Sequence, residues 1–327
     1  VWWAAGRPVA VPDGAGQTIP CVSYTPFRDG QTPFDESFVA PAARIEEDFR
    51  LLGARTRCVR TYSVDQGLEN VPAIAARHGM TVLLGAWIGR EHSKNQAQLE
   101  TAVRLANEYP NTVRAIVVGN EVLLRRERTA QDLAAYLAWA RARTPVPLTY
   151  ADVWEFWTRN PALARSVDFV TIHILPYWED EPTANAAAPA YVVETWRRAR
   201  QAFAGREVFV GETGWPSAGR MREGARPGRI EQARFFRELS RLAEKEEGLR
   251  YNLIEAFDQP WKRASEGTVG GHWGLFDTGR TVKFSWHGPV APEPDWLCRF
   301  AAGEAVALVL FVVAFSRPAR TPVAVIL

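Results

Sequence analysis

The stretch VFVGETGWP, residues 208–216, runs from an apolar segment into a carboxylate, a glycine and a proline. Val208–Val210 have the composition of a buried strand, and Glu212 follows at the point where that strand should end. The stretch AIVVGNE, residues 115–121, has the same arrangement and places Glu121 after an apolar strand. Two glutamates at strand ends suggest paired acid and nucleophile chemistry, if both strands end on the same side of the fold.

Eight segments of the chain are apolar and rich in β-branched or aromatic residues, as strands are. They are Ile19–Tyr24, Cys58–Tyr62, Thr81–Trp87, Val113–Val118, Pro147–Tyr150, Phe169–His173, Glu207–Gly211 and Leu253–Phe257. Strands that are apolar on both faces and alternate with helices predict a parallel sheet. Eight of them predict a (β/α)8 TIM barrel, in which the carboxyl ends of all strands share the face that carries the active site.

Helical spacing of apolar residues supports this alternation. It is found in three of the intervening segments, at Ile45, Phe49 and Leu52, at Leu99, Val103 and Ala106, and at Ile230, Ala233, Phe236 and Leu239. Thr129 with Asp132 resembles a capping box, and Pro161 suits a first helical position. The weak point is 261–283, which is rich in glycine and aromatic residues and predicts no clear eighth helix.

The length of the chain, 327 residues, accommodates one barrel of about 250 residues. We expect a leader at 1–17, a barrel at 18–287 and a proline-rich linker with an apolar tail at 288–327. A doubly wound open sheet is the alternative fold. That fold normally has a glycine-rich phosphate loop after its first strand, and the sequence has none there.

These motifs together resemble glycoside hydrolase family 17. The resemblance rests on the stretches around Glu212 and Glu121, on VRTY at 59–62, on EAFDQPWK at 255–262 and on HWGLF at 272–276, and it covers roughly 19–286. It implies a retaining β-1,3-glucan-active (β/α)8 barrel with the acid/base, here Glu121, after the fourth strand and the nucleophile, here Glu212, at the end of the seventh. The overall style looks closest to bacterial members attached to a membrane-embedded β-glucan synthase. Gln259 departs from the family pattern, which has an acidic residue before the proline.

A retaining mechanism needs two carboxyl groups about 5 Å apart. We expect the negative charge of Glu212 to raise the pKa of Glu121, so that Glu121 is protonated for the first step. The dense aromatic residues at 150–157 favour glucanosyl transfer to a bound sugar over hydrolysis by an endo-β-1,3-glucanase. A non-catalytic glucan-binding barrel is the third hypothesis, although such a protein would be expected to lack one of the glutamates.

Further residues are predicted to bind the sugar. By resemblance Asn120 would contact the 2-hydroxyl, although it could simply end its strand. Tyr62 could hold the nucleophile or be an ordinary barrel tyrosine, and His173 could face the pocket or lie in the core. The remaining candidates are Tyr150, Asp152, Trp154, Trp157, Tyr177, Trp178, Trp215, Glu255, Asp258, Lys262 and Trp273. Exposed aromatic rings among them would stack on the apolar faces of sugars, whereas others would only pack under loops.

Composition argues against other classes of partner. The formal net charge is +2 with no basic block, which disfavours nucleic acid. The five histidines show no ligand spacing and the three cysteines no paired spacing, so we expect no metal or cofactor. We expect separate thiols, although neighbouring strands could bring Cys21 and Cys58 together.

Both ends of the sequence suggest a membrane nearby. The apolar run Ala305–Phe315 is too short by itself to span a bilayer, which takes about 20 residues, and it is followed by Arg317 and Arg320. The segment 1–3 could be the interfacial end of another span, and a packed C-terminal helix is the alternative for the run. We therefore expect a periplasmic or other extracytoplasmic, membrane-tethered protein, with a fused or adjacent membrane glucan synthase as its partner.

Overall fold

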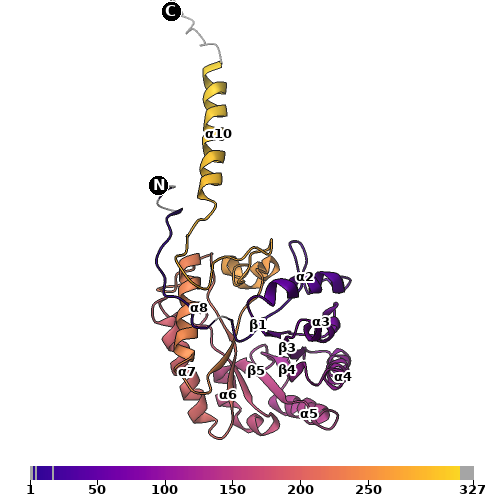
Figure 1. The fold of residues 1–327 in the computed structure, drawn as a ribbon. Helices are drawn as coiled ribbons and strands as arrows, with labels where there is room; N and C mark the ends of the chain where they lie inside the picture. The colour runs from indigo at the N-terminus through magenta and orange to yellow at the C-terminus, as the bar shows by residue number, and fades with distance from the viewer. Residues whose placement is uncertain (1–2, 4–5, 17, 317–327) are drawn as a thin grey trace, which may run out of the picture.

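The computed structural model describes residues 3, 6–16 and 18–316. Eight parallel strands follow one another round a closed barrel, and the first pairs with the last (Figure 1). They are β1 (Val22–Ser23), β2 (Cys58–Arg60), β3 (Thr81–Ala86), β4 (Val113–Asn120), β5 (Leu148–Val153), β6 (Val170–His173), β7 (Val208–Thr213) and β8 (Arg250–Leu253). The predicted (β/α)8 fold is confirmed.

Helices alternate with the strands and surround the barrel (Figure 1). The α-helices are α2 (Ala42–Leu52), α3 (Val71–Arg77), α4 (His92–Glu108), α5 (Ala130–Arg141), α6 (Trp154–Arg159), α7 (Ala188–Ala202), α8 (Arg229–Ala243), α9 (Arg263–Glu266) and α10 (Trp296–Ser316). The 3-10 helices are η1 (Leu68–Asn70), η2 (Pro161–Ser166), η3 (Pro260–Lys262) and η4 (Gly267–Val269). Between β8 and α10 the described chain thus forms short helical turns only, as the composition of 261–283 predicts.

Helix starts also agree with the sequence. The Thr129 hydroxyl accepts a hydrogen bond from the amide of Asp132, whose carboxylate accepts one from the Thr129 amide, which is the predicted capping box of α5. Pro161 begins η2, a 3-10 helix, at a position where its missing N–H is not needed.

The last strand lies earlier than the sequence predicts. β8 is Arg250–Leu253, whereas the prediction was Leu253–Phe257. The strand begins with an exposed arginine and includes a buried asparagine, Asn252, so its composition conceals it. The more apolar 254–257 lies beyond the barrel, where Ile254 and Ala256 continue hydrogen bonding to neighbouring strand ends. Glu255 therefore follows β8 directly.

The barrel interior contains a disulfide, which the expectation of separate thiols did not favour. Cys21, just before β1, is bonded to Cys58 at the start of β2, and their Cα atoms are 4.4 Å apart. The two strands pair in parallel, with Val22 opposite Val59, so the cysteines one position earlier are also opposite one another. Disulfides persist in oxidising compartments, and this bond suggests an extracytoplasmic protein.

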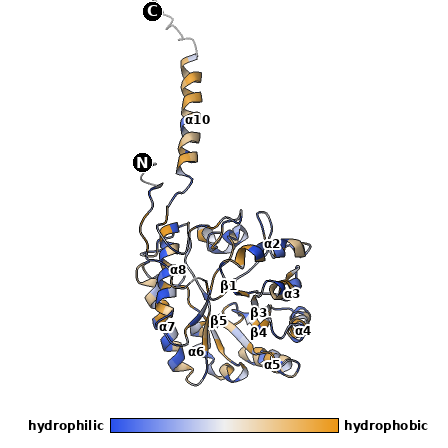
Figure 2. Ribbon diagram, in the orientation of Figure 1, coloured by the Kyte–Doolittle hydropathy of each residue, from blue (hydrophilic) through white to orange (hydrophobic). Residues whose placement is uncertain are grey.

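Helix α10 extends away from the barrel and is mostly hydrophobic (Figures 1 and 2). Its side chains are exposed along its whole length. The apolar run Ala305–Phe315 is part of this 21-residue helix, which by length and composition could cross a membrane. The alternative of a helix packed on the barrel is wrong. Residues 1–2 of the expected interfacial segment, and Arg317 and Arg320, lie outside the described residues.

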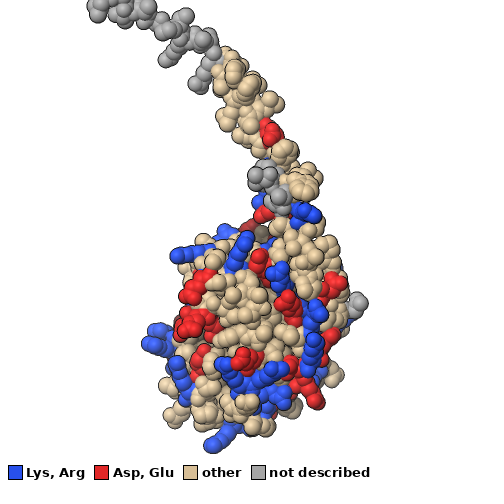
Figure 3. Space-filling view, turned by 90° about the vertical axis from the view of Figure 1, so that its left-hand side faces the viewer, with Lys and Arg blue, Asp and Glu red and all other residues tan. Residues whose placement is uncertain are grey.

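The leader and the linker run along the barrel side by side before α10 begins. Val9 and Val290 form an antiparallel bridge, and the buried Arg237 of α8 donates to the carbonyls of Val11 and Gly288. The division into leader, barrel and tail stays a prediction. On the face that carries α7 and α8, basic and acidic side chains are interspersed (Figure 3).

Candidate active site

The turn after β4 aims Glu121 into the end of the barrel. Both Gly119 and Glu121 have left-handed backbone conformations, with φ of 87° and 52°. A Cβ atom on Gly119 would come within 2.8 Å of the Val122 side chain, so glycine is required there. A non-glycine residue with positive φ costs free energy and occurs often at functional sites, which fits Glu121.

Glu121 and Glu212 face one another at the carboxyl ends of β4 and β7. A carboxylate oxygen of each and a ring nitrogen of His173 all lie within 4.8 Å of one another. His173 Nδ1 is 2.8 Å from Glu121 Oε1, and its Nε2 is 3.7 Å from Glu212 Oε1. The two carboxylates have the short separation that retaining glycosidases use, about 5 to 5.5 Å, rather than the 6.5 Å or more of inverting enzymes.

Arg60, from the end of β2, holds the Glu212 carboxylate from beneath. Its Nη1 donates to Glu212 Oε1 at 2.9 Å and to the carbonyl of Gly211 at 2.7 Å, and its Nη2 donates to Asn120 Oδ1. The side chains of Arg60 and Glu212 are 1% and 6% exposed, so this ion pair is shielded from water. A buried pair with several hydrogen bonds fixes the position of the carboxylate.

The charge state of Glu121 differs from the expectation. Burial raises the pKa of Glu121, but the hydrogen bond from His173 and the charges of His173, Arg125 and Arg60 together lower it below its ordinary value. The sequence suggested only the repulsion from Glu212, which would raise it. The surroundings of Glu121 in this structure therefore favour its ionised form, the opposite of the expectation.

Asn120 lies beside the two glutamates, but its side-chain oxygen accepts from Arg60, which leaves the amide NH2 for a ligand. Tyr62 makes no hydrogen bond with Glu212. Its hydroxyl donates to Ser23 Oγ at 3.0 Å, and burial together with the charge of Glu212 holds the pKa of this hydroxyl well above its usual range. The structure thus places Tyr62 as a barrel tyrosine that packs under Arg60.

Tyr150 and Asp152 support the segment that follows Glu121. The Tyr150 hydroxyl donates to Asp152 Oδ2, and the amide of Leu123 donates to both side chains. Burial raises the pKa of Asp152. Both side chains are fully buried, so here they orient the turn of Glu121 and do not line the cleft.

The aromatic candidates separate by exposure. A cleft of about 420 Å³ above the glutamates is lined by Phe156, Trp178 and Trp273 among others. Trp178 is 36% exposed and its ring stacks on that of Trp273, with centroids 6.3 Å apart. The rings of Trp157, Tyr177 and Trp215 are buried and bonded to backbone carbonyls, and Trp154 packs against the core. Trp273 lines the cleft, but it is only 1% exposed, so the geometry favours Trp178 as the sugar-binding ring, with Trp273 stacked against it.

The polar residues after β8 form two buried ion pairs. Lys262 Nζ is 2.8 Å from Glu255 Oε2, and Lys283 Nζ is 2.6 Å from Asp258 Oδ1. Burial raises the pKa of Glu255 to about 7 in spite of Lys262. Glu255 Oε1 has no partner, whereas Asp258 also accepts from the amide of Gly274 and so fixes the loop that carries Trp273.

Glu121, His173 and Glu212 are also spaced so that they could offer ligand atoms to a metal ion. The same oxygen of Glu212 accepts from Arg60, whose positive charge would oppose a cation there. The trio with its arginine therefore fits acid–base chemistry better than metal binding.

Several residues of the site were not among the candidates. Arg60 is the most central, and its position inside a strand of a predicted barrel was the available signal, because a buried arginine requires a carboxylate partner. Acidic residues also line the cleft, namely Glu155, Glu179, Asp180 and Glu266. Burial and the charge of Glu155 raise the pKa of Glu179 to about 7. These acidic residues carry no sequence signal that distinguishes them from surface residues.

Residues 21–274 match the family described as the BtgE/BtgC glycoside hydrolase domain. The chain belongs to this family of glycoside hydrolases. A glucan 1,3-beta-glucosidase of Arthroderma benhamiae is 29% identical over 259 residues, which are 74% of this chain and 84% of that protein. A glucan 1,3-beta-glucosidase of Candida albicans is 26% identical over 278 residues, or 77% and 88%.

Solved structures agree in fold. The chain is similar to an active-site mutant of Rhizomucor miehei beta-1,3-glucanosyltransferase in complex with laminaritriose, with a TM-score of 0.71, 24% identity, and coverage of 84% of this chain and 99% of that one. It is also similar to an endo-laminarinase from Formosa, with a TM-score of 0.67, 22% identity, and coverage of 82% and 85%. The Rhizomucor miehei enzyme is a glycoside hydrolase family 17 protein, and at 24% identity the likeness shows a shared fold. The bacterial, membrane-associated type stays a prediction.

Proposed function

We propose that this glycoside hydrolase is a retaining β-1,3-glucanosyltransferase that works by double displacement. The observation that carries the mechanism is the approach of the Glu121 and Glu212 oxygens to within 4.8 Å at one end of the barrel. The names of relatives support the substrate, because the curated ones are glucan 1,3-beta-glucosidases and a structural relative was solved with laminaritriose.

In the first step the Glu212 carboxylate oxygen attacks the anomeric carbon, and the bond from that carbon to the glycosidic oxygen breaks. The departing oxygen takes the proton of the Glu121 carboxyl group, which lies 2.8 Å from His173 Nδ1. The glycosyl ester on Glu212 no longer carries the negative charge. In the second step Glu121 removes the proton of an acceptor hydroxyl, whose oxygen displaces Glu212 and restores the starting configuration.

Transfer requires that a sugar hydroxyl reach the ester before water does. The exposed ring of Trp178, which stacks on the buried ring of Trp273 in the cleft that contains Glu121, is suited to hold an acceptor sugar face-on. Positioning of this kind is worth several orders of magnitude in effective concentration, enough for a bound sugar to compete with water. A cleft that does not bind an acceptor would instead give an endo-β-1,3-glucanase.

The roles of the two glutamates are tested with two variants and a control. Glu121→Ala should lose about 10² to 10⁴ in kcat on laminari-oligosaccharides, because general acid catalysis is removed. It should still react with an aryl glucoside that has a good leaving group, and azide should restore turnover since it needs no general base. Glu212→Ala should give no retained product under either condition. Glu194→Ala, on the exposed face of α7, should behave as the wild type.

Retained turnover by Glu212→Ala would disprove the assignment. Transfer is decided by product length, with a linear β-1,3-gluco-oligosaccharide as substrate and mass spectrometry as the readout. Products longer than the substrate should form early and increase in share with substrate concentration. If only shorter sugars form at every concentration, the enzyme is a hydrolase, and binding without cleavage would indicate a glucan-binding barrel.

We also propose that α10 tethers the barrel to a membrane on its extracytoplasmic side. The helix of 21 residues is about 31 Å long, which matches the hydrocarbon thickness of a bilayer, and its side chains have no protein contact that would bury them. The full chain should float with phosphatidylcholine vesicles, and Leu310→Glu with Val313→Glu should abolish flotation without changing turnover. Leu51→Glu, on the exposed face of α2, should still float. Flotation by the α10 variant would refute the tether.

A further inference from the structure

We propose that the Cys21–Cys58 disulfide is a positioning device for the nucleophile. It fixes β1 against β2 directly below the site and so, through Arg60, sets the place of the Glu212 carboxylate. This inference rests on the proposed function of Glu212.

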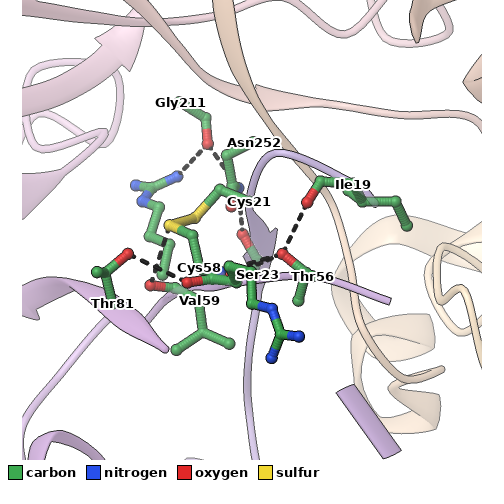
Figure 4. Close-up of a disulfide and its surroundings, with 11 residues drawn as sticks. Ile19, Cys21, Ser23, Thr56, Cys58, Val59, Thr81, Gly211 and Asn252 are labelled. Atoms are coloured by element: carbon green, nitrogen blue, oxygen red, sulfur yellow. Dashed lines mark hydrogen bonds between the residues drawn. A yellow bond between two sulfur atoms is a disulfide. The ribbon is translucent and has the colours of Figure 1, made fainter. Parts of the chain in front are cut away.

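The bond between Cys21 and Cys58 lies close to Ser23, and Asn252 links Ser23 to the Gly211 carbonyl (Figure 4). Cys58 precedes Arg60 by two residues and Cys21 precedes Ser23 by two, so in each strand both side chains point to the same side. Ser23 is directly opposite Arg60 in the β1–β2 register. Cys21 and Cys58 pack with the apolar residues that fill the barrel, such as Leu83 and Val117.

The disulfide joins β1, the shortest strand of the barrel, to β2. β1 has only two residues, and its pairing with β8 is confined to Val22 opposite Leu253. By contrast, β3 and β4 are paired from Val82 to Ala86. Few ladder bonds resist a shift of β1 against its neighbours, and a covalent bond supplies that resistance.

From β1 and β2 two short connections lead to the nucleophile. Arg60 donates to the Gly211 carbonyl and to Glu212 itself, at 2.7 and 2.9 Å. Asn252 of β8 donates to Ser23 Oγ at 2.8 Å and to the same Gly211 carbonyl at 2.9 Å (Figure 4). A shift of β1 relative to β2 therefore changes both hydrogen bonds to the Gly211 carbonyl, the one from Arg60 and the one from Asn252. Reacting groups are sensitive to such displacements, since about 1 Å can cost a hundredfold in rate.

The test uses a double variant, Cys21→Ala together with Cys58→Val, which removes the bond and keeps the total side-chain volume similar. Its control is Cys298→Ser in the exposed α10. Circular dichroism first establishes a temperature at which each variant is fully folded. There the bond-free variant should lose about ten- to a hundredfold in kcat on laminari-oligosaccharides, with KM within about twofold of the wild type. Its crystal structure should show Arg60 Nη1 beyond hydrogen-bond distance of Glu212 Oε1. The control should match the wild type.

Arg60→Lys keeps the disulfide and the charge but not the forked donor, and it should reproduce the loss in kcat at unchanged KM. When Arg60→Lys is combined with the bond-free double variant, kcat should fall by less than about a further twofold. The reason is that both changes act through the contact between Arg60 and Glu212. The inference would be overturned if the folded bond-free variant had the wild-type kcat or kept the 2.9 Å contact between Arg60 Nη1 and Glu212 Oε1. It would also be overturned if the losses in kcat of the two changes were fully additive. Wild-type protein that turns over no β-1,3-glucan would instead refute the proposed function, and the contact distance in the bond-free crystal would still decide the positioning role.

Discussion

Replacing Arg60 by methionine tests how far the site depends on one buried cation. Methionine keeps the length of the side chain but removes the donors to Glu212, Asn120 and Gly211. Gly211 keeps a donor from Asn252, whereas the Glu212 oxygen, whose side chain is 6% exposed, loses its nearest one. Breaking a buried ion pair in this way costs about 3 to 5 kcal/mol, because an uncompensated charge remains.

The carboxylate can avoid that cost only by taking up a proton, and a neutral carboxyl group is a poor nucleophile. We therefore expect the melting temperature of Arg60→Met to fall by about 5 to 10 °C, and kcat on laminari-oligosaccharides by about 10² to 10³. Circular dichroism melts and initial rates at neutral pH measure both.

The matched control is Arg198→Met, which removes an exposed pair with Glu194 on α7 and should change the free energy of unfolding by less than about 0.5 kcal/mol. Wild-type kcat in Arg60→Met would refute the role of Arg60 in holding the nucleophile. A melting temperature equal to that of the control would show that the Glu212 carboxylate needs no buried partner.

Three further predictions follow from named contacts. Trp178→Ala should remove stacking worth about 1 kcal/mol and shift products from transfer to hydrolysis. The control Trp139→Ala on α5 should leave the products unchanged. Unchanged product lengths in Trp178→Ala would contradict the binding of an acceptor sugar on this ring. The raised pKa of Glu255, about 7, means that the folded protein binds an extra proton above the ordinary carboxyl pKa, so this group's contribution to stability falls as pH rises from about 4.5 to 7. Glu255→Gln should flatten that part of the melting-temperature profile, and an unaltered slope would show that Glu255 is ionised throughout. Removing the Cys21–Cys58 bond, which spans 37 residues, should lower the free energy of unfolding by about 4 kcal/mol in a urea titration, and a loss below about 1 kcal/mol would contradict the chain-entropy reasoning.

The fold could be predicted because its information is local. Apolar strands such as Val113–Val118 and start signals such as Thr129 with Asp132 are legible in a few neighbouring residues. β8 was misplaced for the same reason, since Arg250 and Asn252 do not look like a strand until the barrel closes around them. The positions of Glu121 and Glu212 followed from strand ends alone.

Contacts between distant strands could not be predicted in this way. The disulfide depends on the register of β1 and β2, and adjacency alone left Cys21 and Cys58 as an open alternative. The lowered pKa of Glu121 depends on His173, which lies 52 residues away in the chain. Among the tryptophans, the exposure of Trp178 and the burial of Trp157 are decided by loops whose course the sequence does not reveal.

The site holds its two carboxylates with unequal firmness, and the inequality matches the tasks that the proposed mechanism gives them. Glu212 must present one oxygen in a fixed direction, and Arg60 forms a buried, hydrogen-bonded ion pair with it. Glu121 must give up a proton in one step and accept one in the next, and its side chain is 23% exposed, with a single ring nitrogen at 2.8 Å. Glu121 stays without its proton between the two steps and regains one when it removes the proton of the acceptor hydroxyl. The rigid group makes the bond to carbon, and the looser one moves the proton.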